Sequence, residues 1–162
     1  MWLSSASRSL RSLGECAHTA ANLAASIRDQ QERVHTLTSI FRAMARFFWF
    51  TIEFGLMKSK SRDGLKVYGS GLLSSYGEIQ HAIESPEVQR CPIQLEWAIN
   101  QGFEIDHYQP LLFIVDSFDH LFSLVGCLEQ WMKQGRLNNV APGEPSVDEA
   151  DLKSFLDAVL VA

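Results

Sequence analysis

Hydrophobic residues recur at steps of three and four between positions 34 and 48 of the chain. This is the spacing of one face of an α-helix. The residues that share it are Val34, Leu37, Ile40, Phe41, Met44, Phe47 and Phe48. The pattern predicts helical structure from about Ala17 to Lys58. The polar stretch from Ser26 to Glu32 is the expected place for a break between two helices.

The middle of the chain predicts short elements separated by turns. Leu65–Tyr68 alternates apolar and polar residues, which is typical of a short strand. Ser75 followed three residues later by Glu78 is a capping-box pattern, so we expect a helix that ends near Ile83. A further short helix is expected at Leu95–Asn100.

The last third of the chain predicts extended structure at 103–115, then a helix with Ser117 as its cap that runs from Phe118 to about Lys133. Glycine, asparagine and two prolines at 135–145 favour a linker. A second capping-box pattern begins an amphipathic helix expected over 146–162. Helices dominate these predictions, so the expected fold is mainly α with a small β component.

Composition is that of one ordinary globular domain, with 162 residues and 46% hydrophobic content. The formal net charge of -5 disfavours nucleic acid and anionic membrane surfaces as partners. Arg46, Glu53 and Lys58 interrupt the longest apolar run, so no membrane-spanning helix is expected.

The cysteines argue for a reducing environment. Cys16, Cys91 and Cys127 are widely spaced and no C-x-x-C pattern occurs. A disulfide framework or a structural zinc site is therefore not expected, and we predict a cytoplasmic location. The first fourteen residues are serine-rich and lack acids, a weak targeting pattern for which an arbitrary start is the favoured interpretation.

One carboxylate stands inside an almost unbroken apolar and aromatic run, Phe47–Met57. Burying an ionised carboxylate without a partner costs on the order of several kcal/mol, so such a group protonates, pairs or binds a metal. Glu53 is thus either turned to solvent or engaged by a partner, and the sequence pattern leaves both possibilities open.

Four segments together resemble a known family. Phe48–Leu56, Val67–Glu78, Tyr108–Leu111 and Val115–Phe118 are similar to the C-terminal half of the catalytic domain of the biopterin-dependent aromatic amino acid hydroxylases, most of all the bacterial type that acts on phenylalanine. The likeness is clear over about 20–125. It implies a partial catalytic domain at 1–134, followed by the linker and the final helix.

The resemblance implies a monooxygenase that uses Fe(II), dioxygen and tetrahydrobiopterin or a related tetrahydropterin, with L-phenylalanine to tyrosine as the expected reaction. In the family, iron is held by two histidines and one carboxylate. Glu53 falls on the carboxylate ligand, and Trp49 falls on an aromatic wall of the amino-acid pocket. Gly71 and Ser74 fall in the loop that receives the amino-acid end of the substrate, where Ser74 can bond a ligand histidine.

The family's two ligand histidines come from a His-x-x-x-x-His element upstream of the carboxylate, and this chain lacks it. Its histidines are His18, His35, His81, His107 and His120. Counting back from Glu53, we expect this chain to begin just past the place where that element would end. Most of the family's pterin-binding face is expected upstream of Met1 as well. A substitute site that joins His18 or His35 to Glu53 is the less favoured interpretation.

Two functions are therefore open. The chain is either part of a longer, iron- and pterin-dependent hydroxylase, inactive by itself, or a remnant without catalysis that acts as a binding or interaction module. The sequence does not determine the oligomeric state.

Overall fold

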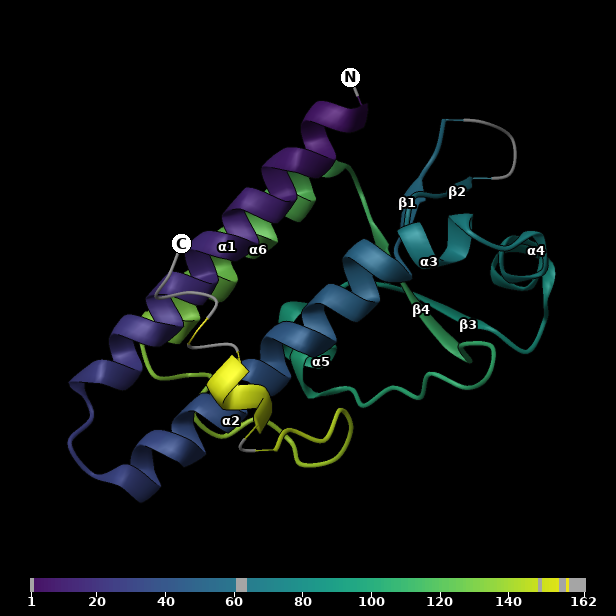
Figure 1. Cartoon of the computed structure of the whole chain (residues 1–162). Coiled ribbons are helices and arrows are strands. Elements are labelled where there is room, and N and C mark those ends of the chain that lie inside the picture. The colour runs from purple at the N-terminus through teal and green to yellow at the C-terminus, as the bar shows by residue number, and fades with distance from the viewer. Residues whose placement is uncertain (1, 61–63, 149, 155–156, 158–162) are drawn as a thin grey trace.

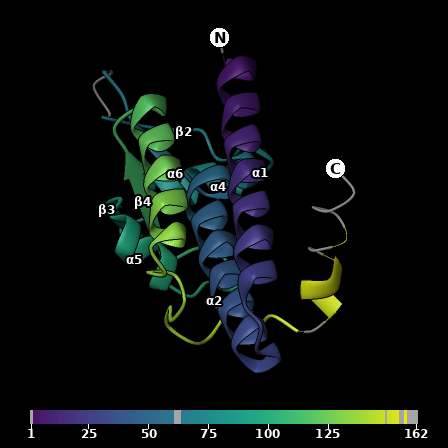
Figure 2. The same ribbon diagram turned by 90° about the vertical axis from the view of Figure 1, so that its left-hand side faces the viewer.

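Three long helices lie side by side, and a small sheet stands next to them (Figures 1 and 2). The helices are α1 (Trp2–Ser26), α2 (Gln30–Phe48) and α6 (Phe118–Lys133), and α1 packs on both of the others. The computed structural model describes residues 2–60, 64–148, 150–154 and 157. The expected fold class, mainly α with a small β component, is confirmed.

The break predicted between the first two helices is confirmed at residues 27–29. The Asp29 side chain accepts a hydrogen bond from the Glu32 amide at 2.8 Å and so caps the start of α2. The first helix begins at Trp2 rather than near Ala17. A polar run therefore ended one helix and began the next, as its composition indicated.

Helix continues after Phe48 only as a π-helix to Glu53, so the prediction that it reaches Lys58 is wrong beyond Glu53. The chain forms a π-helix, η1, at Trp49–Glu53 and then strand β1 at Leu56–Lys58. The Phe54 amide donates to the Trp49 carbonyl at 2.8 Å, a bond over five residues that widens the turn. Pairing of β1 with two other strands then fixes the extended chain, a tertiary effect that the local pattern does not contain.

The sheet has four strands in the order β2-β1-β4-β3, where β2 is Leu65–Val67, β3 is Gln89–Pro92 and β4 is Leu111–Val115. Strand β1 is antiparallel to β2 and parallel to β4, and β3 is parallel to β4. The strand predicted at 65–68 is confirmed as β2. Of the extended structure predicted at 103–115, residues 111–115 form β4, whereas 103–110 form neither helix nor strand. Strands β1 and β3 were missed because each has three or four residues and pairs only with distant chain.

Two capping predictions are confirmed. Ser75 caps α4 (Tyr76–Glu84) by accepting from the Glu78 amide at 3.4 Å, and Ser117 caps α6 in the same way. Helix α5 (Leu95–Asn100) has its expected bounds. A short helix, α3 (Ser70–Leu73), was not expected.

The sheet separates two apolar clusters. On β4, the side chain of Leu112 joins a cluster with Leu72 of α3 and Ala82 of α4, whereas Phe113 joins the larger cluster under the long helices. This alternation is the two-residue period of a strand. Strand β4 is thus buried on both faces, and it anchors the chain that precedes it.

The segment predicted as a linker, 135–145, packs against the helices. Leu137 is fully buried, and the Val140 amide donates to the Ser39 hydroxyl of α2 at 2.9 Å. Beyond it, residues 150–154 and 157 are helical. The cap is Asp148, which accepts from the Asp151 amide at 2.8 Å, rather than Ser146. The rest of the predicted final helix lies outside the described residues.

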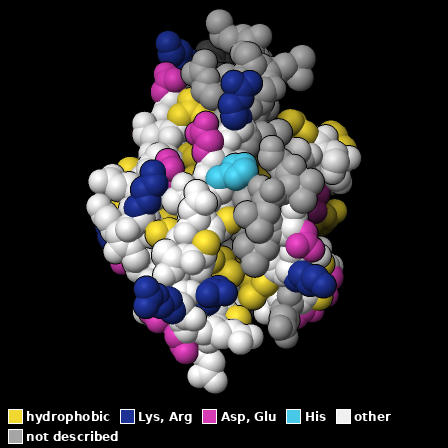
Figure 3. All heavy atoms as spheres, turned by 60° about the vertical axis from the view of Figure 1, so that its left-hand side comes forward, with side chains coloured by type: hydrophobic (Ala, Val, Ile, Leu, Met, Phe, Trp, Pro, Cys, Tyr) yellow, Lys and Arg dark blue, Asp and Glu magenta, His cyan; other side chains and the backbone are white. Residues whose placement is uncertain are grey.

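Acidic and basic side chains are interspersed on the face in Figure 3, with only scattered apolar areas between them. This surface does not gather one sign of charge. Among the described helices, none is long and apolar enough to cross a membrane.

The packing of α1 on α6 can be tested through the cysteines. Cys16 of α1 is 1% exposed, and burial raises the pKa of its thiol to about 11. Cys127 of α6 is exposed. Since the thiolate is the reactive form, we expect a disulfide reagent at pH 8 to modify Cys127 rapidly and Cys16 only after addition of denaturant. Mass spectrometry of wild type and of Cys127→Ser identifies each site, and equal rates for the two thiols would show that α1 is not packed as described.

Candidate functional site

Glu53 is the last residue of η1 and is half-buried. Within the described part of the chain, no hydrogen bond or ion pair reaches its carboxylate. A π-helical turn is uncommon and often marks a functional position. The sequence left open whether Glu53 is turned to solvent or engaged by a partner. No protein partner for its carboxylate is found among these residues.

Gly69, the N-cap of α3, and Gly71 in its first turn lie directly against Glu53. A Cβ atom at Gly69 would stand 2.4 Å from the Glu53 carbonyl oxygen, and one at Gly71 would stand 3.0 Å from the Glu53 Oε2 atom. The Ser70 hydroxyl donates to the Ile52 carbonyl at 3.3 Å. Side chains are disfavoured at these two positions because the start of α3 approaches the backbone and the carboxylate of Glu53 so closely.

Ser74 lies at the end of α3 and is exposed. Its hydroxyl donates to the Gly71 carbonyl oxygen at 2.6 Å. Gly71 and Ser74, which were predicted to lie in a loop, thus belong to the short helix α3 and its C-cap, and this bond joins them to each other.

Trp49 begins η1 and is packed on both faces of its indole. Phe54 stacks on it with ring centroids 4.4 Å apart, and Phe103 stacks on it at 4.2 Å with an interplanar angle of 6°. Because those two rings make no contact with each other among the described ring pairs, they cover opposite faces. Trp49 was predicted as an aromatic wall of an amino-acid pocket, and in the structure both faces of its indole are covered by side chains of the same chain.

Gln109 fixes the edge of the same indole and was not predicted as a site residue. It is 3% exposed, and its Oε1 atom accepts from Trp49 Nε1 at 3.1 Å. Its Nε2 atom donates to the carbonyl oxygens of Glu104 at 2.7 Å and His107 at 3.2 Å. The only sequence signal was its place in the Tyr108–Leu111 motif, because this contact spans sixty residues.

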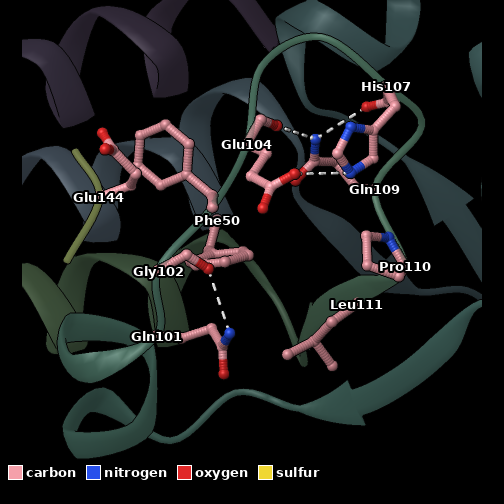
Figure 4. Close-up of a pocket in the computed structure, with 10 residues that line it drawn as sticks. Phe50, Gln101, Gly102, Glu104, His107, Gln109, Pro110, Leu111 and Glu144 are labelled. Carbon is pink, nitrogen blue, oxygen red and sulfur yellow. Dashed lines mark hydrogen bonds and ion pairs between the residues drawn. The ribbon is translucent and has the colours of Figure 1, made fainter.

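A cavity of about 330 Å³ opens beside this group (Figure 4). Phe50, Phe103 and Leu111 give it apolar walls, while Glu104 and Glu144 place carboxylates on its rim. Figure 4 shows the amide of Gln109 directed at the 104–107 turn that borders the cavity. The cavity and the Trp49 stack therefore share Phe103 and Gln109.

Comparison with known proteins matches residues 30–136 to the family model described as biopterin-dependent aromatic amino acid hydroxylase. The chain belongs to this family. It is 38% identical over 78 residues to the phenylalanine-4-hydroxylase of Mesorhizobium japonicum and 42% identical over 77 residues to that of Homo sapiens, or 48% and 47% of this chain. A structure of phenylalanine hydroxylase from Chromobacterium violaceum with iron and phenylalanine bound superimposes with a TM-score of 0.51 at 29% identity, over 64% of this chain.

This hydroxylase-family chain spans only part of its relatives. The matches cover 28% and 16% of the two curated enzymes and 40% of the solved structure. The family is shown by the model that matches residues 30–136, and the solved structure shows that the matched part shares its fold.

The described residues do not complete the family's iron ligand set. The one group of three potential metal ligands found among them, within 4.8 Å of one another, is Glu104, Asp106 and His107, and it excludes Glu53. His18 and His35, the sequence candidates for a substitute site, are exposed side chains of α1 and α2. One carboxylate without histidines does not fit a mononuclear iron centre. A complete centre therefore requires histidines from beyond this group of described residues.

Proposed function

We propose that this chain is the carboxylate-bearing part of a hydroxylase that converts L-phenylalanine to tyrosine with dioxygen, ferrous iron and a tetrahydropterin such as tetrahydrobiopterin. The observation that carries the proposal is the family match over 30–136, which includes a half-buried, unpaired Glu53 on a π-helical turn. The free cysteines suit the reducing cytoplasm that we propose as its location.

In this proposal Glu53 supplies one anionic ligand to the iron, and residues of a further segment supply two histidines. Its carboxylate is free to do so, since no protein group engages it in the described structure. Gly71 leaves open the space beside Glu53 Oε2, where a Cβ atom would come within 3.0 Å. Ser74, the C-cap of α3, donates a hydrogen bond to the Gly71 carbonyl. Trp49 provides the aromatic wall for the substrate ring.

The second candidate is a binding or interaction module without catalysis. The observation that favours it is the missing ligand set around Glu53 among the described residues. An experiment must therefore supply the histidines and ask whether chemistry returns.

We expect the 162-residue chain alone to form no measurable tyrosine from L-phenylalanine with ferrous iron and tetrahydrobiopterin, because one protein ligand holds iron poorly. The test is a chimera in which the N-terminal part of the Chromobacterium violaceum enzyme, up to the portion that this chain matches, is fused to residues 30–162. We expect the chimera to bind about one iron per chain and to form tyrosine. Iron is measured by metal analysis and tyrosine by chromatography.

The parent Chromobacterium violaceum enzyme is the positive control. Tyrosine formation by the isolated chain would refute the claim that its ligand set is incomplete. A folded chimera that binds L-phenylalanine, but that binds no iron and forms no tyrosine, would favour the binding module. A search of the DNA upstream of Met1 for His-x-x-x-x-His is an independent check.

A further inference from the structure

Phe103 lies where an aromatic substrate ring would stack on Trp49. Its ring is parallel to the indole, with an interplanar angle of 6° and a centroid distance of 4.2 Å. These are the values of an offset-stacked aromatic pair. We propose that Phe103 is a gate residue that fills the ring slot of the amino-acid site, and that the side chain of an aromatic amino acid binds by taking its place. The inference rests on the proposed function and deepens it.

The slot has two aromatic walls besides the gate. Phe50, which is 2% exposed, meets Phe103 edge-on at 6.2 Å and 88°. Trp49 faces the same ring in parallel. A phenyl group therefore sits between one face-on and one edge-on partner, and the phenyl group of L-phenylalanine has the same size and shape as the one now present. The walls themselves are fixed by η1 and by the bond between Trp49 and Gln109.

The gate stands on chain that can move without breaking the core. Residues 101–110 form neither helix nor strand, and residues 104–108 are all exposed. Ile105 and Tyr108 are 77% and 51% exposed. Few buried contacts and exposed backbone are the properties of locally opening segments. Gln109 ties the 104–107 turn to the indole from behind, so the turn can stay attached while Phe103 swings out.

The cavity next to the gate gives the displaced ring a destination. Phe103 lines the cavity of about 330 Å³ together with Phe50 and Leu111, so a displaced phenyl ring can lie against apolar walls there. When a ligand ring replaces it, Phe103 therefore loses less buried surface than it would lose by moving fully into water. The apparent affinity of a ligand that binds only the open form is its intrinsic affinity multiplied by the fraction of open molecules. Removing the gate should raise affinity for aromatic rings.

Phe103→Ala in the full chain tests the gate, with toluene and L-phenylalanine as probes. The readout is the indole N–H signal of Trp49 in two-dimensional NMR, assigned by its loss in Trp49→Phe. We expect toluene to shift this signal saturably in Phe103→Ala, with affinity at least about 10-fold above wild type, since an apolar cavity binds small aromatic molecules. L-phenylalanine should gain a similar factor. Phe103→Leu, which fills part of the slot, should fall between the two and serves if the alanine variant unfolds.

Phe118→Ala is the matched control, because Phe118 is another half-buried ring outside this slot, edge-on to Tyr68 at 5.6 Å. It should leave toluene binding at the wild-type level. If toluene binds neither Phe103→Ala nor Phe103→Leu better than wild type, the gate is overturned whatever the chimera does. If toluene binds and L-phenylalanine does not, the slot exists but is not the ring site of the amino acid, while the proposed function is still decided by the chimera.

Discussion

Replacing Arg46 with methionine is expected to lower the free energy of unfolding by roughly 3–5 kcal/mol. Arg46 is fully buried in α2, and its guanidinium donates to the carbonyl oxygens of four residues. These four are Ile99, Ala141, Pro142 and Glu144, at distances between 2.7 and 3.2 Å. Methionine fills similar volume but leaves these carbonyls without their donor.

The charge on Arg46 is part of this effect. Burial, and to a lesser extent the neighbouring Arg42, lowers the pKa of Arg46, yet a guanidinium stays protonated at every pH at which proteins are studied. No carboxylate pairs with it in the described part of the chain. Carbonyl dipoles alone therefore hold the cation, and they join 141–144 to the helix that leads into η1.

Urea denaturation followed by circular dichroism measures the loss, and Arg42→Met is the matched control. Arg42 is half-buried and makes one bond, from Nε to the Pro145 carbonyl at 3.3 Å. Arg42→Met should lower the free energy of unfolding by less than about 1 kcal/mol. Equal losses in the two variants would mean that the four-carbonyl arrangement around Arg46 is not formed.

Glu53→Gln in the chimera is expected to reduce tyrosine formation by at least about 100-fold, because loss of a group that only orients a metal ligand already costs 10- to 100-fold. Glutamine keeps the shape of the side chain and removes its negative charge. The same change should lower iron content in metal analysis. Unchanged iron content together with unchanged turnover would rule out Glu53 as a ligand.

The isolated chain supplies the structural control for this substitution. Since no hydrogen bond or ion pair reaches the Glu53 carboxylate there, Glu53→Gln should change the free energy of unfolding by less than about 0.5 kcal/mol. Glu78→Gln is the matched variant in the chimera, as Glu78 is another half-buried glutamate whose pKa is raised by burial. It should retain iron. A large loss of stability in Glu53→Gln would instead give Glu53 a structural role.

The sequence by itself determined the elements whose signals are local. Ser75 and Ser117 are polar caps that satisfy free amides at helix starts, and each is followed by a run of helical periodicity. The family likeness was also legible, because its motifs are short, ordered and rich in aromatic residues. A helix cap and a family motif can each be read from a few consecutive residues.

Tertiary structure alone decided how the candidate site is built. Periodicity continued the helix past Phe48, but strand pairing of β1 with β2 and β4 ended it and left the π-helical turn that carries Glu53. Phe103 and Gln109 reach Trp49 across more than fifty residues. Such contacts depend on the path of the intervening chain, for which residue spacing carries no signal. The sequence thus identified Glu53 and Trp49 as candidate site residues. The fold determined that the Glu53 carboxylate is unpaired and that the Trp49 indole is covered.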